Sequence, residues 1–208
     1  MDILQITGLT KRRPGFRLDL LTLSVPAGSI VGLIGENGAG KTTLMELILN
    51  AATRDSGTIL AFGQDTLTHE KAVKQRIGVV QDDCHLPLLF SPADVETVLR
   101  RIYTQWDSDQ YRVLLETFQL PTNREIATFS KGMRVKLNLA IALAHHAELL
   151  LLDEATSGLD PIVHAQVLDL LLGFTRSGTG SVLLSTHITS DLTKTADYIA
   201  LLHQGKLL

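Results

Sequence analysis

The stretch that decides the fold of this chain is GENGAGKTT, residues 35–43. The apolar run before it, SIVGLIG, is bounded by glycines and predicts a buried strand. The run after it, KTTLMELILNAA, carries apolar residues at helical spacing and ends before the polar TRDSG. The spacing G-x-x-x-x-G-K-T between a strand and a helix is typical of a phosphate-binding loop. A glycine-rich turn that only caps a helix is the alternative, and the order of strand, loop and helix disfavours it.

Each residue type in this loop suits a chain of phosphates. Glycines let the loop curl so that backbone N–H groups point at phosphate oxygens, and the helix that follows adds the positive end of its dipole. We expect Lys41 to reach the β- and γ-phosphates of a nucleotide, Thr42 to bind Mg²⁺ and Thr43 to contact the α-phosphate.

A second run, LLLLDE at residues 149–154, joins four leucines to two acids. In an open α/β sheet the carboxyl end of such a buried strand lies at the ligand crevice. There Asp153 would face Mg²⁺ through water, and Glu154 would polarise an attacking water as a general base. Taken alone, the run also fits a solvated turn after a core strand, and the phosphate loop makes that alternative the weaker one. Asp160, which precedes Pro161, predicts a helix N-cap, and this role is compatible with a functional one.

Two further polar residues end predicted strands. Gln81 follows IGVV and His187 follows SVLLST. A glutamine there can coordinate Mg²⁺ or the attacking water, and a histidine can hydrogen-bond the γ-phosphate, although each taken singly also fits an ordinary loop residue. The remaining histidines show no pairing that predicts a metal site and are expected to be structural or surface residues: His69, His85, His145, His146, His164 and His203.

The stretch FSKGM, residues 129–133, opens a predicted apolar helix. It places a hydroxyl, a positive charge and a glycine next to one another at the helix start. Ser130 predicts an N-cap, and the positive end of the helix dipole favours an anion at this point. A plain N-cap with no ligand is the simpler interpretation.

The rest of the chain alternates predicted strands and helices, which implies a mostly parallel sheet with helices on both faces. The middle, residues 91–119, instead carries two helical patterns and predicts a small helical insert. We expect one α/β domain over residues 1–208, with a helical subdomain over about residues 88–146. A chain of 208 residues is long enough to bury a sizeable core.

Composition narrows the function classes. Hydrophobic residues make up 45% and charged residues 20% of the chain, the balance of a globular protein. The net charge of -3, without a long basic run, disfavours nucleic acid as a partner. The one cysteine, Cys84, excludes an internal disulfide and fits a reducing compartment. The apolar runs are too short to cross a bilayer, so a membrane role would act through another protein.

The combination of these motifs resembles that of one protein family. The order GENGAGKTT, Gln81, FSKGM, LLLLDEATSGLD and His187 closely resembles the ATP-binding subunit of ABC transporters, over essentially the whole chain. The resemblance implies a P-loop NTPase fold of ABC type, with a mostly parallel central sheet, an N-terminal antiparallel β part and a small helical subdomain. The variant SKGM and the stretch IYTQWDSDQYRVLLETFQLP also resemble ABC-2-type systems related to bacitracin and other peptide-resistance exporters.

The resemblance implies a role for each motif in a dimer that holds ATP between two subunits. Residues 35–43 are the Walker A loop, residues 130–133 the signature sequence and residues 157–160 the D-loop. Catalytic roles are implied for Glu154, His187 and Gln81, and Mg²⁺ contacts for Thr42, Gln81 and Asp153. The implied contacts to ATP on the same chain are Gly35, Glu36, Asn37, Gly38, Ala39, Gly40, Lys41, Thr42, Thr43 and Phe16. The implied contacts to ATP on the opposite subunit are Ser130, Lys131, Gly132, Met133, Ser157 and Asp160.

The chain departs from the family pattern in the signature sequence. The usual form is LSGGQ, and Phe129, Lys131 and Met133 replace three of its residues here. Ser130 and Gly132 are kept, so the hydroxyl and the close backbone approach to a γ-phosphate are kept too.

Two other departures lie at the adenine and after the catalytic glutamate. The family usually stacks an aromatic side chain on adenine, where this chain has Arg12 and Arg13. Either Phe16, the nearest aromatic, takes that role or an arginine stacks instead. Ala155 stands where proline is common, and we expect little effect from it.

The function implied by the resemblance is ATP hydrolysis that drives transport, in the export direction, through a separate transmembrane permease subunit. The second ATPase subunit is either an identical or a different chain. The implied location is cytoplasmic, at the inner face of the cell membrane and held there by the partner. The alternative is an ABC ATPase that does not transport and signals through a membrane or soluble partner.

Overall fold

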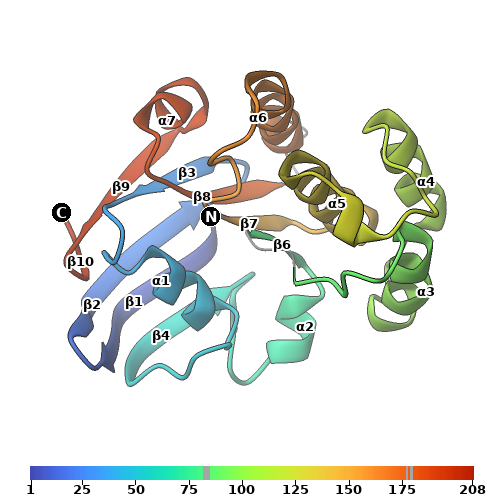
Figure 1. Cartoon of the computed structure of the whole chain (residues 1–208). Coiled ribbons are helices and arrows are strands. Elements are labelled where there is room, and N and C mark those ends of the chain that lie inside the picture. Colours follow the sequence, from blue (N-terminus) through green and yellow to red (C-terminus); the bar gives the residue numbers. More distant parts are fainter. Residues whose placement is uncertain (82–84, 177, 179) are drawn as a thin grey trace.

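A six-stranded sheet forms the centre of the computed structural model, which describes residues 1–81, 85–176, 178 and 180–208. Neighbouring strands are parallel except for the short edge strand β10, which runs antiparallel to β9 (Figure 1). Cys84 lies outside the described residues. In spatial order the strands are β10 (Lys206–Leu207), β9 (Tyr198–His203), β3 (Ile30–Ile34), β8 (Ser181–Thr186), β7 (Leu149–Asp153) and β6 (Ile77–Gln81).

The four leucines of β7 show why this sheet is buried on both faces. Leu149 and Leu151 point into a core shared with the N-terminal strands, while Leu150 and Leu152 point into a second core on the opposite face. Because side chains alternate along a strand, a continuous apolar run fits a strand that is covered on both sides. The second face is covered by α5 (Lys131–Ala144), α6 (Pro161–Arg176) and α7 (Thr189–Thr195) (Figure 1).

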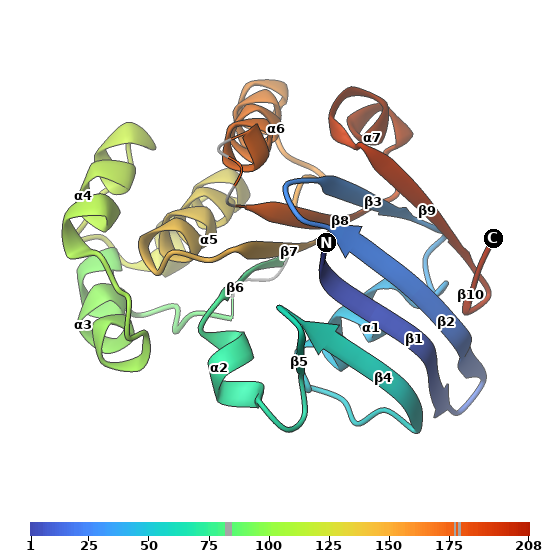
Figure 2. The ribbon, with the colours of Figure 1, turned by 180° about the vertical axis from the view of Figure 1, so that it is seen from behind.

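A second, antiparallel sheet packs over the first core with α1 (Lys41–Ile48) between the two sheets, as Figure 2 shows from behind. The short helix α2 (Glu70–Lys74) follows this sheet. The sequence patterns did not predict α2, β5 or β10. In spatial order the strands of the antiparallel sheet are β2 (Phe16–Pro26), β1 (Asp2–Arg13), β4 (Ser56–Ala61) and β5 (Gln64–Asp65).

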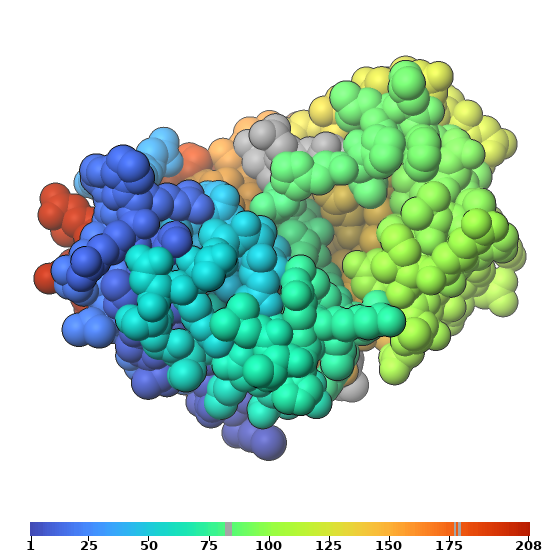
Figure 3. All heavy atoms as spheres, turned by 90° about the horizontal axis from the view of Figure 1, so that it is seen from below, coloured from blue at the N-terminus to red at the C-terminus, as the bar shows by residue number. Residues whose placement is uncertain are grey.

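The helical insert forms a lobe at one side of the molecule, across from the N-terminal strands (Figure 3). Its two helices, α3 (Pro92–Ile102) and α4 (Ser108–Thr117), share a third apolar core with one face of α5. Ser91 and Asp94 form a capping box at the start of α3, and Asp107 caps α4, so the sequence itself sets where both helices begin. Tyr111 is fully buried in this core.

His145 joins the far end of α5 to the central sheet. Its ring nitrogens lie 3.0 Å from the carbonyl oxygen of Ile141 and 3.2 Å from that of Ile77 at the start of β6. The ring also stacks on Tyr103, with 3.9 Å between centroids and 4° between the planes. Burial disfavours the charged imidazolium and lowers the pKa of His145 to about 4, although the two carbonyls act in the opposite direction.

The predicted fold class, α/β with a mostly parallel sheet and an antiparallel N-terminal part, is confirmed. Every strand and helix that the sequence patterns predicted is present at its expected place. Within the described ranges, none of the helices combines the length and the apolar character that crossing a bilayer requires.

Candidate functional site

Most of the predicted phosphate-binding residues gather in a pocket of about 530 Å³ at the carboxyl ends of the parallel strands, although Gly35 and Ala39 of the loop do not line it. The pocket is lined by the phosphate loop, by Glu154 and by the tip of the β1–β2 hairpin. A larger cavity of about 880 Å³ lies elsewhere, beside Phe62 and Arg76, and contains none of these residues. The smaller pocket is the candidate site, because ligands of open α/β sheets bind at the carboxyl ends of the strands.

The phosphate loop has the backbone conformation that a ring of inward N–H groups requires. Gly38 and Gly40 have φ values of 83° and 114°, a region that residues with a side chain rarely adopt. At Gly40 a side chain would also collide with Phe16, since an added Cβ would lie 2.6 Å from that ring. The loop ends in α1, whose first residues are Lys41, Thr42 and Thr43. The structure therefore presents N–H groups, a helix start and a cation at one point.

Lys41 is buried and reaches back across the loop. Its Nζ donates hydrogen bonds to the carbonyl oxygens of Gly35, at 2.5 Å, and Glu36, at 3.3 Å. The same ammonium lies 3.1 Å from Oε1 of Glu154, in an ion pair without hydrogen-bond geometry. The ammonium therefore lies between the loop that would hold phosphates and the acid that would act on water.

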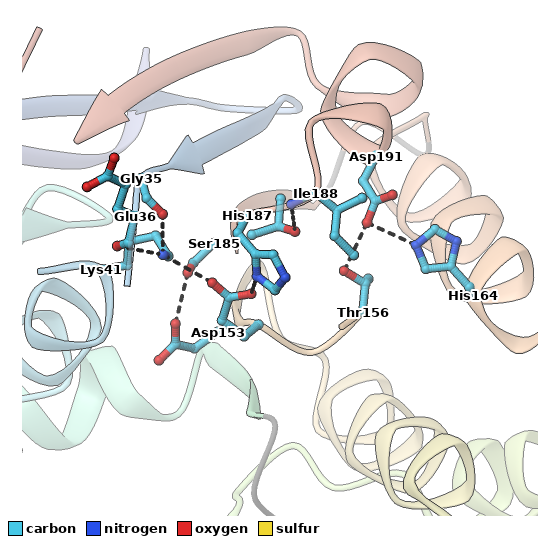
Figure 4. Close-up of polar contacts among 12 residues, drawn as sticks. Gly35, Glu36, Lys41, Asp153, Thr156, His164, Ser185, His187, Ile188 and Asp191 are labelled. Atoms are coloured by element: carbon cyan, nitrogen blue, oxygen red, sulfur yellow. Dashed lines mark hydrogen bonds and ion pairs between the residues drawn. The ribbon is translucent and has the colours of Figure 1, made fainter. Parts of the chain in front are cut away.

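Glu154 contacts both Lys41 and His187, the two residues that Figure 4 labels on either side of it. Its Oε2 lies 2.6 Å from Nδ1 of His187, and its own backbone N–H donates to the carbonyl oxygen of Ser185 at 3.0 Å. The φ of Glu154 is 52°, an unusual conformation for a residue with a side chain. Such strained residues persist where the surrounding contacts hold them, and they cluster at functional sites.

Asp153 precedes Glu154 at the end of β7, and its side chain is 7% exposed. Its Oδ1 accepts a hydrogen bond from the hydroxyl of Ser185 at 2.9 Å, and Gln81 is its partner in strand register on β6. Thr42 is exposed at the start of α1. Carboxylate, amide and hydroxyl oxygens are hard donors of the kind that Mg²⁺ prefers, so this donor set fits that ion.

The hairpin tip covers the open side of the pocket with Arg13, Pro14, Gly15 and Phe16. The ring of Phe16 lies against Gly40 and is only partly exposed. Arg13 is exposed, and its guanidinium is held by the carboxylate of Glu46 on α1 at 2.6 Å. Of the stacking candidates, Phe16 and Arg13 thus border the pocket and are each positioned by a neighbour, whereas Arg12 is not among the residues that line it.

The signature and D-loop residues lie outside the described lining of this pocket. Ser130 is exposed and caps α5, accepting a hydrogen bond from the N–H of Met133 at 3.2 Å. Asp160 caps α6, accepting from the N–H groups of Ile162 and Val163. Gly132 is buried against Val163, where an added Cβ would lie 3.0 Å from a methyl carbon. Lys131, which precedes it, reaches toward Gly158.

The structure thus brings the phosphate loop, Asp153, Glu154 and His187 together and leaves the signature residues on a separate surface. Two site residues were not predicted from the sequence, Ser185 beside Asp153 and Glu46 beside Arg13. The position of a serine inside an apolar strand was the one sequence feature that could have pointed to a role for Ser185. No sequence feature pointed to Glu46.

Comparison with known proteins agrees with this geometry. The family model described as "ABC transporter" matches residues 18–157. The bacitracin transport ATP-binding protein BcrA of Bacillus licheniformis is 32% identical over 99% of this chain and 68% of its own length. The daunorubicin/doxorubicin resistance ATP-binding protein DrrA of Streptomyces peucetius is 32% identical over 99% of this chain and 64% of its own. The chain therefore spans about two thirds of the length of these relatives.

A solved structure described as the ATP-binding subunit of an ABC transporter shares the fold. It superimposes with a TM-score of 0.89 at 25% sequence identity, covering 99% of this chain and 88% of the other.

Proposed function

The chain belongs to the family of ABC transporter ATP-binding domains, as its motifs predicted, and from that premise we propose that it hydrolyses ATP to drive a separate membrane permease. Domains of this family bind ATP and are ATPases. The observation that carries the proposal is the chain of contacts that runs from Lys41 through Glu154, both in the lining of the phosphate-loop pocket, to His187.

Hydrolysis would use the groups of this pocket in distinct roles. The phosphate loop and Lys41 would hold the β- and γ-phosphates, and Mg²⁺ would supply positive charge to the phosphate oxygens. Thr42, Asp153 and Gln81 are the proposed contacts to that ion, directly or through water. Phe16 or Arg13 would support the base.

Glu154 would act as the general base. His187 would position Glu154 and would also contact the γ-phosphate. A water between Glu154 and the γ-phosphate would attack the phosphorus while its proton moves to the carboxylate. The bond from that phosphorus to the β–γ bridging oxygen would break, and the products would be ADP and inorganic phosphate. Lys41 contacts the same carboxylate in this structure, so phosphate would compete with Glu154 for the ammonium. Binding of the nucleotide would thereby release Glu154 for water.

Completion of the site is proposed to need a second ATPase subunit, identical or different. Ser130, Lys131, Gly132 and Met133 start α5 on a surface apart from the pocket, so their helix start can face a γ-phosphate only on another chain. Ser157 and Asp160 of the D-loop would approach from the same side. The helix dipole and the serine hydroxyl favour an anion there.

We further propose that residues 1–208 act as one domain and that the helical part, about residues 88–146, contacts the permease. It has its own apolar core and begins a few residues after Gln81 in the sequence. The exposed Leu88 and Leu89 are available for such a contact. The proposed place of action is the cytoplasmic face of the membrane, through the partner.

Export is the proposed direction of transport. Two similar proteins are named for bacitracin transport and for daunorubicin/doxorubicin resistance, and the SKGM variant of the signature resembles the same exporter group. The transported substrate would be selected by the permease.

The test is Glu154→Gln, which keeps the shape of the side chain and removes the base. With ATP and Mg²⁺ we expect hydrolysis to fall by roughly 100-fold or more, and a stable ATP-bound dimer to appear in light scattering. Asp109→Asn, on the exposed face of α4, is the matched control and should leave turnover unchanged. Wild-type hydrolysis by Glu154→Gln, or an ATP-loaded variant that stays monomeric at high concentration, would contradict the proposal.

A further inference from the structure

We propose that the buried carboxylate of Asp191 positions Glu154 and His187 for hydrolysis, acting through Thr156 and His164 (Figure 4). The inference rests on the proposed function, because it assigns Asp191 a part in the hydrolysis that Glu154 performs. It concerns a cluster outside the pocket, in which His164 was expected from the sequence to be only a structural or surface residue.

Two donors converge on one oxygen of Asp191. Its Oδ2 accepts a hydrogen bond from the hydroxyl of Thr156 at 3.0 Å and lies 2.9 Å from Nε2 of His164. A carboxylate can only accept, so the network assigns the ring proton of His164 to Nε2. Asp191 and Thr156 are each 1% exposed. A buried carboxylate is costly without donors, so these two bonds fix its position strongly.

The three residues come from segments that continue directly from functional ones. Thr156 stands two residues after Glu154, and Asp191 stands four residues after His187. His164 lies in the first turn of α6, behind its cap at Asp160. One oxygen therefore ties together the segments that follow Glu154, the D-loop and His187.

Asp191 itself is held against the strand that leads into the phosphate loop. The next residue, Leu192, packs on Gly32 of β3 so closely that a Cβ there would lie 2.5 Å from its methyl carbon. Beyond the end of α7, the carboxylate of Asp197 accepts the N–H of Ile30 at 2.8 Å. The carboxylate of Asp191 is thus a fixed point relative to the phosphates that the loop would hold.

The conformation of Glu154 shows why a fixed point is needed. Its left-handed backbone, with φ at 52°, would relax unless the residues around it prevent this. On one side Asp153 is held in the sheet, and on the other the bond from Thr156 to Asp191 holds the segment after it. Without that bond Glu154 could turn, and its 2.6 Å contact with His187 would lengthen.

The experiment compares Thr156→Val with Thr195→Val, using the full chain at a concentration where activity per chain has stopped rising. Each variant removes one buried threonine hydroxyl, but the hydroxyl of Thr195 bonds to the backbone oxygen of Asp191 and not to its carboxylate. We expect Thr156→Val to lower kcat about 10-fold while the Kd for ATP stays within about twofold. Thr195→Val should keep kcat within about twofold, and Thr156→Ser should restore it.

His164 provides a second test on a partly exposed residue, where a change is better tolerated. His164→Leu removes the donor and should lower kcat several-fold, whereas His164→Gln keeps an N–H and should retain most of it. The inference is overturned if Thr156→Val and His164→Leu fold and keep kcat within about twofold, or if Thr195→Val loses as much. Loss of hydrolysis in Glu154→Gln, but not in these variants, would overturn this inference alone.

Discussion

The two halves of the nucleotide site differ in how far one chain completes them. In the phosphate-loop half, Glu154 already contacts both Lys41 and His187. In the signature half, the hydroxyl of Ser130 accepts a hydrogen bond from its own helix. That cap uses the oxygen as an acceptor, so the O–H proton is left to donate to a phosphate. In the proposed function, one half is thus assembled by folding, and the other would be assembled by the meeting of two chains.

Lys41→Ala is expected to have the largest effect and would act on the first half alone. It removes the buried cation from the loop and leaves Oε1 of Glu154 without its ion-pair partner beside incoming phosphates. We expect the Kd for ATP of the monomer to rise roughly 100-fold or more, measured by calorimetry. Lys74→Ala, which breaks an exposed ion pair on α2, is the control and should bind ATP as the wild type does. Unchanged binding in Lys41→Ala would show that the loop does not hold the phosphates.

Ser130→Ala should separate the two halves. The monomer should bind ATP normally, because Ser130 lies outside its pocket, whereas hydrolysis at high chain concentration should fall about 10-fold through the lost contact in the dimer. The variant also loses an N-cap worth about 1 kcal/mol. Ser91→Ala removes the cap of α3 at a similar cost and should hydrolyse ATP normally. If Ser130→Ala and Ser91→Ala lose the same amount of activity, Ser130 acts only as a helix cap.

Gly132→Ala tests which role the glycine has. An added methyl would press on Val163, so we expect a loss of hydrolysis of a few fold and a loss of stability of about 1 kcal/mol. Adding Val163→Ala makes room and should remove the steric part of both losses. If the double variant recovers thermal stability but not hydrolysis, the glycine serves the approach of a phosphate. Full recovery of both would make it a helix-packing residue.

The smallest expected effect is a pH dependence of stability at the contact that joins α5, the helix of the signature half, to the central sheet. His145 joins the end of α5 to β6, and its pKa is lowered to about 4. The unfolded chain therefore binds a proton near pH 6.5 and the folded chain does not, so stability is full above pH 6.5 and falls as the pH drops toward 4. Replacing the residue with glutamine should flatten the dependence of Tm on pH in this window relative to the wild type. The same change at His203, which is exposed on β9, should keep the wild-type slope.

Most of the fold could be predicted from local sequence patterns. The run LLLLD and the glycines of residues 35–40 show their structure through features that operate within a few residues, namely alternation along a strand and a positive φ. The caps of α3 and α5 are equally local. For that reason the strand ends, the phosphate loop and Ser130 could be predicted in place.

The pairings across the sheet could not be predicted in this way. The bonds from Ser185 to Asp153 and from Thr156 to Asp191 depend on which strands and helices become neighbours, and residues far apart in sequence supply the two ends. Phe16 shows the same limit. Its aromatic character suggested a base platform, but its packing on Gly40 follows from the position of the β1–β2 hairpin. Both stacking alternatives stay predictions.

The separation of Ser130 from the pocket has a consequence for the cell. In the proposed dimer, a lone chain could bind ATP and still not consume it, because the second half of the site would arrive with another chain. The rate per chain would then rise with chain concentration when the protein is dilute. A permease that holds two copies side by side would replace that dependence with an effective concentration on the order of millimolar. ATP hydrolysis would thus be confined to assembled transporters, and no separate inhibitor would be needed to keep free chains inactive.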